Sequence, residues 1–265
     1  MTPAHRPRKR FGQHFLADQT IVEGIVGAIS PQPGDRMIEI GPGQGALTIP
    51  LLKCIAHLDV IELDRDLVAE LRQRFRPEQL TVHSADALEF DFGSLGNDLR
   101  IVGNLPYNIS TPLLFHLTHY AHCVRDLHFM LQKEVVERMV AAPSTADYGR
   151  LSVMLQDRFD MQSLFEVPPE AFRPPPKVDS AVVRMRPLSA AERRARGASH
   201  DAAAFARVVT AAFGMRRKTL RNSLAGVVDA EILKRLGIDP GARAENLSPG
   251  DFARIAAHGG SPEVP

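Results

Sequence analysis

The chain has 265 residues, of which 44% are hydrophobic and 24% charged, which suits either one large folded domain or a large domain with a small companion. No segment approaches the roughly 18 apolar residues of a membrane span, and residues 1–10 lack the apolar core of a signal peptide, so we expect no membrane association and a cytoplasmic location. The net charge of +1 hides two basic segments, residues 1–10 and 184–221, which indicate either a polyanionic partner or solvated surfaces.

The first predicted element is a helix over residues 19–29, because Asp18 can cap it and its apolar residues follow helical spacing. Short β-like runs and helix-like segments then alternate, with strands at 36–40, 57–63, 80–85, 100–105 and 126–131 and helices at 45–54, 65–75 and 111–120. Because parallel strands need a crossover, usually a helix, this alternation predicts an α/β fold with a parallel sheet.

The second half of the chain predicts the end of the sheet and a second domain. Helices at 133–142 and 148–159 precede strands at 161–167 and 180–187, which a proline-rich loop connects. We therefore expect a first domain over residues 1–187, including a basic tail at 1–15. Residues 188–200 contain few large apolar side chains and are predicted to form a linker, followed by a small all-helical domain over 201–265.

A glycine-rich loop follows the first strand of the sheet, in the segment IEIGPGQG. Gly41, Gly43 and Gly45 permit a tight turn and a close approach of a ligand to the backbone. Glu62 ends the next strand, where a carboxylate can bind a ribose diol. A dinucleotide and S-adenosylmethionine both fit this pattern, and a glycine turn without a ligand stays possible. Asp86 ends the third strand and can accept a hydrogen bond from an adenine amino group.

The segment NLPY, residues 104–107, stands at the carboxyl end of the fourth strand, beside the same edge. The amino group of adenine is a weak nucleophile because its lone pair is delocalised into the ring. The side-chain oxygen of Asn104 and the carbonyl of Leu105 or Pro106 can accept its hydrogens and localise that pair, while Tyr107 offers a face for stacking. The simpler interpretation is a strand-ending turn with a packed tyrosine.

Several segments in this order, RKRFGQHFL, IEIGPGQGALT, VIELDRDL, SADAL, NLPYNIS and FRPPPKVDSAVV, resemble the ribosomal RNA adenine dimethyltransferases. The resemblance covers nearly the whole chain, including FGMRRKTLRNSL in the helical region. It implies a Rossmann-like S-adenosylmethionine-dependent methyltransferase domain, with no metal. It also implies dimethylation of two adjacent adenosines near the 3′ end of 16S rRNA in the small ribosomal subunit, coupled to late subunit biogenesis.

Individual site residues follow from that resemblance. The matching cofactor positions are His14, Leu16, Gly41, Gly43, Glu62, Asp86 and Asn104. The matching catalytic positions are Asn104, Leu105, Pro106 and Tyr107, with Phe172 as a second aromatic that would enclose the flipped adenine together with Tyr107. The family often has asparagine where this chain has His14, and a histidine can likewise donate or accept a hydrogen bond at this position.

The basic segments suit an RNA substrate, and DNA is not expected. The predicted phosphate contacts are Arg8, Lys9, Arg10, Arg216, Arg217, Lys218 and Arg221, which make residues 201–265 an RNA-binding domain of an expected monomer. Three other functions stay open. They are a 23S rRNA adenine methyltransferase of the macrolide-resistance type, an assembly factor whose binding role dominates, and a dinucleotide oxidoreductase.

Overall fold

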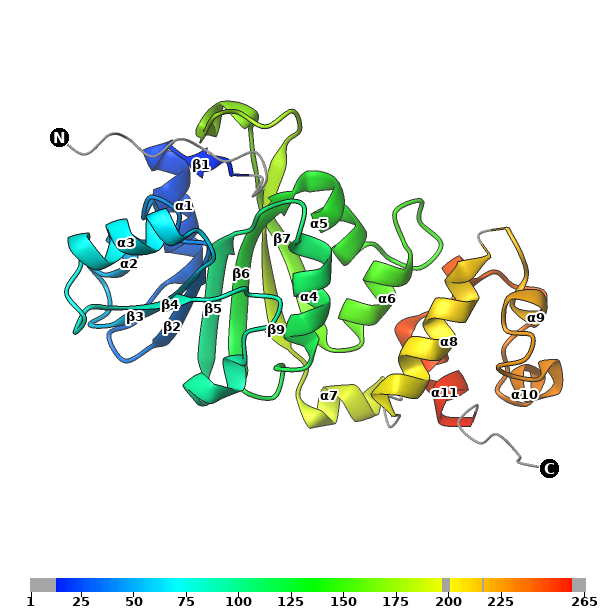
Figure 1. Ribbon diagram of the computed structural model, residues 1–265. Helices are drawn as coiled ribbons and strands as arrows, with labels where there is room; N and C mark the ends of the chain where they lie inside the picture. Colours follow the sequence, from blue (N-terminus) through cyan, green and yellow to red (C-terminus); the bar gives the residue numbers. More distant parts are fainter. Residues whose placement is uncertain (1–12, 197–200, 216, 259–265) are drawn as a thin grey trace. The chain divides into compact units, whose positions relative to one another are not determined.

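The computed structural model describes residues 13–196, 201–215 and 217–258. In these ranges seven strands form one sheet in the order β4-β3-β2-β5-β6-β9-β7 (Figure 1). Their bounds are Arg36–Ile40 for β2, Leu58–Glu62 for β3, Leu80–Ser84 for β4, Leu99–Asn104 for β5, Val124–Gln132 for β6, Phe159–Val167 for β7 and Ser180–Pro187 for β9. Each strand overlaps a predicted one, and the α/β fold class is confirmed.

The pairing places the ends of five strands at one edge. Strand β2 is parallel to β3 and β5, which are in turn parallel to β4 and β6. In this register Met37 of β2 lies opposite Leu58 in β3 and Arg100 in β5. Strand β9 is antiparallel to β6, and Ser180 at its start lies opposite Gln132 at the end of β6. The loops after β2, β3, β4 and β5 therefore converge at the carboxyl edge of the sheet.

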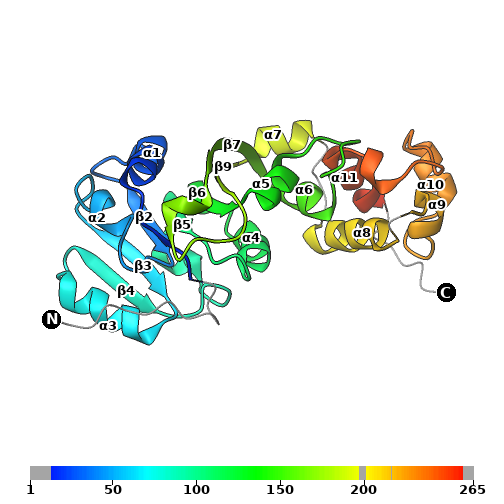
Figure 2. The ribbon, with the colours of Figure 1, turned by 90° about the horizontal axis from the view of Figure 1, so that it is seen from above.

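Helices cover the sheet because their apolar residues recur on one side. In α1, Gln19–Ile29, the Asp18 carboxylate accepts hydrogen bonds from the amides of Thr20 and Ile21, as its predicted cap role requires. Its residues Val22, Ile25 and Ile29 join a core with α2, Thr48–Leu51, α3, Arg65–Arg74, and one face of the sheet. Helix α4, Ser110–Thr118, lies on the other side of the sheet from α1 (Figures 1 and 2). Each fully buried leucine or valine stabilises the fold by about 1.5–3 kcal/mol.

A second, two-stranded sheet near the carboxyl edge was not predicted. Strand β1, Phe15–Leu16, pairs antiparallel with β8, Phe172–Arg173, so that Leu16 lies opposite Phe172. The amides of Ala17 and Asp18 also donate to the carbonyl of Ala171. These bonds fasten the segment before α1 to the loop between β7 and β9, which also contains a short 3-10 helix, η3, Pro169–Ala171.

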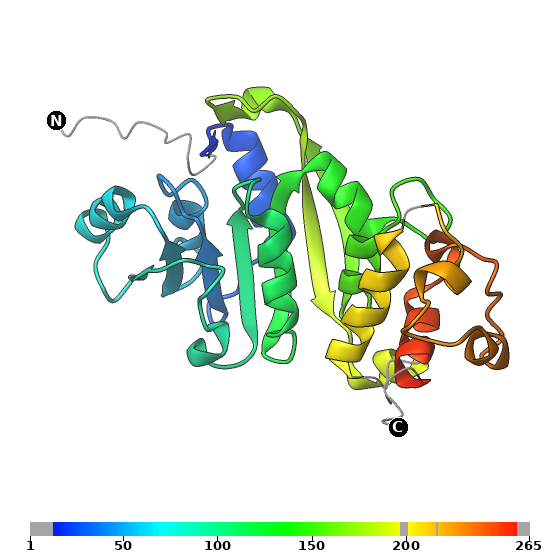
Figure 3. The ribbon, with the colours of Figure 1, turned by 45° about the vertical axis from the view of Figure 1, so that its right-hand side comes forward.

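The described residues divide into two compact units, one within residues 1–136 and 161–187 and the other within residues 137–160 and 188–265. The second unit contains the second half of α5, Lys133–Val140. Its other elements are α6, Arg150–Gln156, α7, Ala190–Ala195, α8, Ala202–Gly214, α9, Leu220–Ser223, α10, Ala230–Arg235, η4, Ala244–Asn246, and α11, Pro249–His258. Helices α8 and α11 lie side by side (Figure 3). Another 3-10 helix, η2, Phe92–Leu95, belongs to the first unit.

Two details of this division differ from the expected domain boundaries. Residues 137–160 belong to the second unit because Tyr148 and Val153 pack into its core and the Tyr148 hydroxyl donates to the Leu247 carbonyl at 2.8 Å. The predicted linker contains helix α7, whose capping box joins Ser189 to Glu192. Within the described ranges, none of the helices combines the length and apolarity needed to span a membrane.

Candidate active site

A cavity of about 330 Å³ lies at the carboxyl edge of the sheet in the first unit. Its wall contains every residue that the sequence predicted for the cofactor, and also Leu105, Pro106 and Tyr107. These side chains come from the segment before α1, from the loops after β2 and β4, and from the ends of β3 and β5. The fold thus brings together residues that are far apart in the chain, such as His14 and Asn104, which are 90 positions apart.

The glycine loop approaches its neighbours closely. The Gly41 amide donates to the Ile61 carbonyl at 2.9 Å, which ties the loop to β3. Gly43 has a φ of 56°, in the left-handed region, and a Cβ atom there would lie 3.1 Å from the ring of Phe15. Any other residue would therefore strain the loop and push it against β1. The Gly43 amide also donates to Oε2 of Glu62 at 3.4 Å, a long hydrogen bond.

Glu62 is buried at the end of β3, and its carboxylate is held by backbone donors. The Asp64 amide donates to Oε1 at 2.8 Å, while Gly43 reaches Oε2. Burial raises the pKa of Glu62, and these hydrogen bonds oppose that effect by favouring the ionised form. The result is an oriented acceptor at the cavity wall that suits a pair of vicinal hydroxyl groups.

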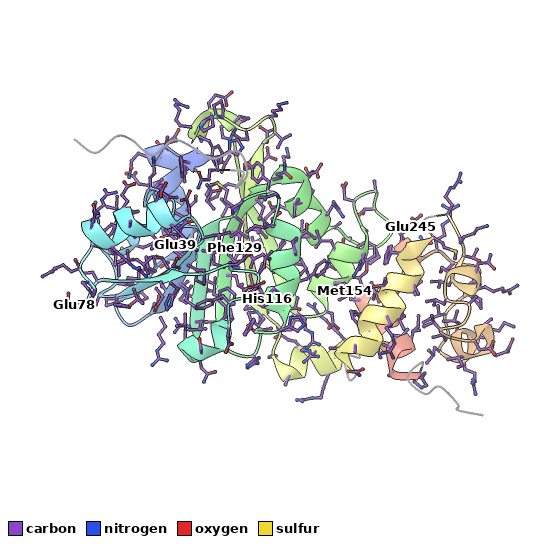
Figure 4. All side chains as sticks on the ribbon, in the orientation of Figure 1. Glu39, Glu78, His116, Phe129, Met154 and Glu245 are labelled. Carbon is purple, nitrogen blue, oxygen red and sulfur yellow. The ribbon has the colours of Figure 1, made fainter. Side chains whose placement is uncertain are left out.

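Glu39 is a second buried carboxyl group in the same wall, and the sequence analysis missed it. It lies in β2, inside the first unit (Figure 4), and accepts a hydrogen bond from Oγ1 of Thr48 at 2.5 Å. Burial raises its pKa to about 7, and the nearby charge of Glu62 contributes to the increase. The available signal was an acidic residue inside the otherwise apolar run from Met37 to Ile40.

Asp86 is half-buried beyond the end of β4, and its Oδ1 accepts a hydrogen bond from the Leu88 amide at 2.9 Å. This bond fixes the carboxylate in the turn that follows the strand. Among the described residues no hydrogen bond reaches Oδ2 of Asp86. The turn therefore presents one carboxylate oxygen that can accept a hydrogen bond from a ligand in the cavity.

The end of β5 carries Asn104, whose position depends on the glycine before it. A Cβ atom on Gly103 would lie 2.5 Å from the Ile40 carbonyl oxygen, so only glycine allows β5 to approach β2 this closely. The Nδ2 group of Asn104 donates to the His14 carbonyl at 2.9 Å. This bond orients the carboxamide and leaves Oδ1 as an acceptor that no described residue engages.

The two backbone carbonyls proposed beside Asn104 differ in this structure. The Pro106 carbonyl accepts from the Ile109 amide at 3.2 Å, within the turn that leads into α4. No donor from the described part of the chain reaches the Leu105 carbonyl. The Leu105 amide donates to the carbonyl of Met130 at 3.1 Å, which fixes the backbone at this position. The carbonyl of Leu105 is therefore the better placed of the two to accept a hydrogen bond from a ligand.

Tyr107 is restrained at its hydroxyl and on one face. Its hydroxyl shares a 2.6 Å hydrogen bond with Oγ of Ser180, and burial raises the pKa of the phenol, so the ring stays neutral. The His14 ring stacks on Tyr107 with centroids 5.7 Å apart and planes at 25°. Nδ1–H of His14 donates to the Pro174 carbonyl at 2.8 Å. His14 thus touches the aromatic ring as well as lining the cavity.

Phe172 is not part of the cavity wall. Its ring is fully buried in the core shared with Leu16, so in this structure it presents no face to a base opposite Tyr107. Of the predicted phosphate contacts, Arg217, Lys218 and Arg221 are exposed in the second unit, at and just before α9. Arg8, Lys9, Arg10 and Arg216 lie outside the described residues.

The strand order and the ligand edge define a Rossmann-like methyltransferase fold. A dimethyladenosine transferase from Plasmodium falciparum superposes with a TM-score of 0.79 at 25% identity, covering 91% of this chain and 96% of that one. The 23S rRNA methyltransferase ErmE shares the fold, with a TM-score of 0.67 at 24% identity over 93% of this chain and 100% of that chain.

Residues 4–258 match the model of the ribosomal RNA adenine dimethylase family, and the chain belongs to that family. A relative from Thiobacillus denitrificans, named ribosomal RNA small subunit methyltransferase A, is 64% identical over 254 residues, which are 96% of this chain and 98% of the relative. The chain is a methyltransferase whose cofactor is S-adenosylmethionine, so the dinucleotide oxidoreductase interpretation is wrong.

The residues present fit that cofactor. Glu62 supplies an oriented carboxylate for a ribose diol, Oδ1 of Asp86 is already bonded and Oδ2 is open, and Gly43 permits close backbone approach. In the part of the chain that the structure describes, no cluster of three or more His, Cys, Asp or Glu side chains is arranged to hold a metal ion.

Proposed function

We propose that this protein dimethylates the 6-amino groups of two adjacent adenosines near the 3′ end of 16S rRNA. The substrate is the small ribosomal subunit at a late stage of its biogenesis, in the cytoplasm, and the enzyme acts as a monomer. The name and 64% identity of the Thiobacillus denitrificans relative support the choice of subunit over the 23S alternative. The observation that carries the chemistry is a single cavity wall that contains Glu62, Asn104 and Tyr107.

The cofactor half of the cavity consists of residues around β2, β3 and β4. Glu62 binds the ribose hydroxyls, Asp86 accepts from the adenine amino group, and Gly41 and Gly43 let the backbone approach. The segment His14–Leu16 closes this half, since its pairing with β8 places it in the cavity wall. When bound, S-adenosylmethionine supplies an activated methyl group on a sulfonium sulfur.

The target half is built at the end of β5. Oδ1 of Asn104 and the Leu105 carbonyl accept the two amino hydrogens of the flipped adenine, and the nitrogen lone pair then points out of the ring plane. Methyl transfer places positive charge on that nitrogen, and both oxygens stabilise it. The proton leaves to solvent after transfer, so the site needs no strong general base.

Tyr107 stacks on the target base, while Phe172 acts indirectly in this proposal. With its ring in the core and its backbone paired with Leu16, Phe172 holds the segment that carries His14. Three exposed basic residues of the second unit contact phosphates in this proposal, namely Arg217, Lys218 and Arg221. They form a basic group without a described ion pair.

The test uses labelled S-adenosylmethionine, small subunits from cells that lack the modification, and mass spectrometry of the digested nucleosides. We expect dimethyladenosine in 16S rRNA and none in large subunits or DNA. A Glu62→Gln variant keeps the side-chain volume, loses the charge that binds the ribose diol, and should need far more cofactor for the same rate. Label in 23S rRNA would reverse the choice of substrate, and particle binding without transfer would favour an assembly factor.

A further inference from the structure

The hydroxyl of Tyr107 has one hydrogen-bond partner among the described residues, Ser180, at 2.6 Å. We propose that Ser180 is a positioning residue, which acts through this bond to set the angle of the Tyr107 ring against the target adenine. This inference rests on the proposed stacking role of Tyr107. It assigns a task to the last residue of the FRPPPKVDS segment, which otherwise lies outside the cavity wall.

Ser180 is a rigid anchor because of its place in the sheet. It is fully buried at the first position of β9 and lies opposite Gln132, where β6 ends. The pairing continues beyond the two strands, since the amide of Lys133, which follows β6, donates to the carbonyl of Asp179, which precedes β9, at 2.9 Å. A buried hydroxyl on a strand that has neighbours on both sides, here β6 and β7, moves little, so its partner is also held.

Tyr107 needs such an anchor because it lies in a loop. Its backbone is fixed by the turn from Pro106 to Ile109 and by Oγ of Ser110, which donates to the Tyr107 carbonyl at 3.0 Å. Neither bond restrains rotation of the side chain. The His14 ring is stacked on one face of Tyr107, with the ring centroids 5.7 Å apart, and this stacking contact fixes no polar atom. The Ser180 bond is therefore the polar restraint on ring orientation.

The consequence is a separation between the two substrates. Tyr107 belongs to the loop after β5 and Ser180 to β9, whereas the proposed cofactor residues Glu62 and Asp86 belong to β3 and the turn after β4. Loosening the ring should therefore weaken productive binding of the adenosine and leave the cofactor in place. If Ser180 had a purely structural role, its loss would instead weaken the binding of the adenosine and of the cofactor alike and would lower the thermal stability.

The experiment is a double-mutant cycle with Ser180→Ala, Tyr107→Phe and the double variant, assayed on small subunits. Tyr107→Phe keeps the aromatic face and removes only the bond. We expect each single variant to lower kcat/KM for the particle about tenfold, the double variant to be no worse than either, and cofactor affinity to stay at the wild-type value. The control is Ser152→Ala, which should keep full kcat/KM. Ser152 is also fully buried, but its hydroxyl donates to the backbone carbonyl of Arg138.

Additive losses in the double variant, or a wild-type kcat/KM for Ser180→Ala, would overturn the positioning role. If Ser180→Ala does not fold, Tyr107→Phe alone decides, because wild-type kcat/KM in that variant shows that the bond is dispensable. Failure of the proposed function looks different, since the wild-type protein would then transfer no methyl group to the particle.

Discussion

Replacing Gly103 by alanine should damage stability and activity together. The new methyl carbon would lie 2.5 Å from the Ile40 carbonyl oxygen, almost an ångström short of ordinary contact, and 3.2 Å from the Leu105 side chain. Backbone on one side and a buried leucine on the other leave no flexible group that can move away. Strands β2 and β5 must therefore separate, at a cost of about 1–3 kcal/mol, as for other overpacked cores.

The same displacement reaches the site, because Asn104 follows Gly103 directly and Ile40 precedes the glycine loop. We expect a melting temperature lower by about 2–4 °C for each kcal/mol and a fall in kcat of at least tenfold. Scanning calorimetry and the particle assay measure the two effects. Gly27→Ala is the matched control, since its Cβ meets nothing within 4 Å on the exposed side of α1 and should stabilise the protein by about 0.5–1 kcal/mol. A Gly103→Ala protein as stable and active as Gly27→Ala would refute the argument.

Three further outcomes follow from other parts of the structure. The pKa of Glu39 is raised to about 7, so its contribution to the free energy of unfolding is complete below pH 4.5 and is lost as pH rises through 7. A Glu39→Gln variant should lack this decrease, which is on the order of 3 kcal/mol. Urea unfolding at several pH values measures it. Tyr148→Phe should cost about 1 kcal/mol in calorimetry and leave cofactor affinity in titration calorimetry unchanged, since its buried hydroxyl donates to Leu247 in the second unit. Replacing Arg217, Lys218 and Arg221 together by neutral residues should weaken particle binding in filter assays. The slope of log K against log salt concentration should become shallower by about one per lost phosphate contact. An unchanged slope would show that these side chains are only solvated.

The strands and the ligand edge could be predicted because their signals are local. Alternating apolar runs and helical spacing identify each element, and parallel pairing then forces the loops after β2, β3 and β5 to one edge. The position of Gly41 and Glu62 at this edge, where both line the cavity, could be predicted for the same reason. What the residues alone left open was the ligand, since a dinucleotide needs the same turn and the same carboxylate.

The missed features depend on pairs of residues far apart in the chain. Strand β1 has two residues, too few for a periodic pattern, and exists because Phe172 and Arg173 offer it an edge. The bond between Tyr107 and Ser180 joins residues 73 positions apart. The packing of Phe172 into the core, away from the cavity wall, likewise follows from its contact with Leu16, which a sequence motif does not encode.

The arrangement of acceptors also bears on why two successive transfers to one nitrogen are unequal. An unmodified amino group has two hydrogens, which match Oδ1 of Asn104 and the Leu105 carbonyl. After the first transfer one hydrogen remains, so one of these oxygens loses its partner when the monomethylated base binds. A lost hydrogen bond of this kind costs about 1 kcal/mol, which slows the second transfer roughly fivefold unless water reaches the abandoned oxygen. The first methyl group takes the place of one hydrogen at one of these two oxygens, and the Asn104 carboxamide, which is tied to His14, cannot turn freely to restore the lost bond.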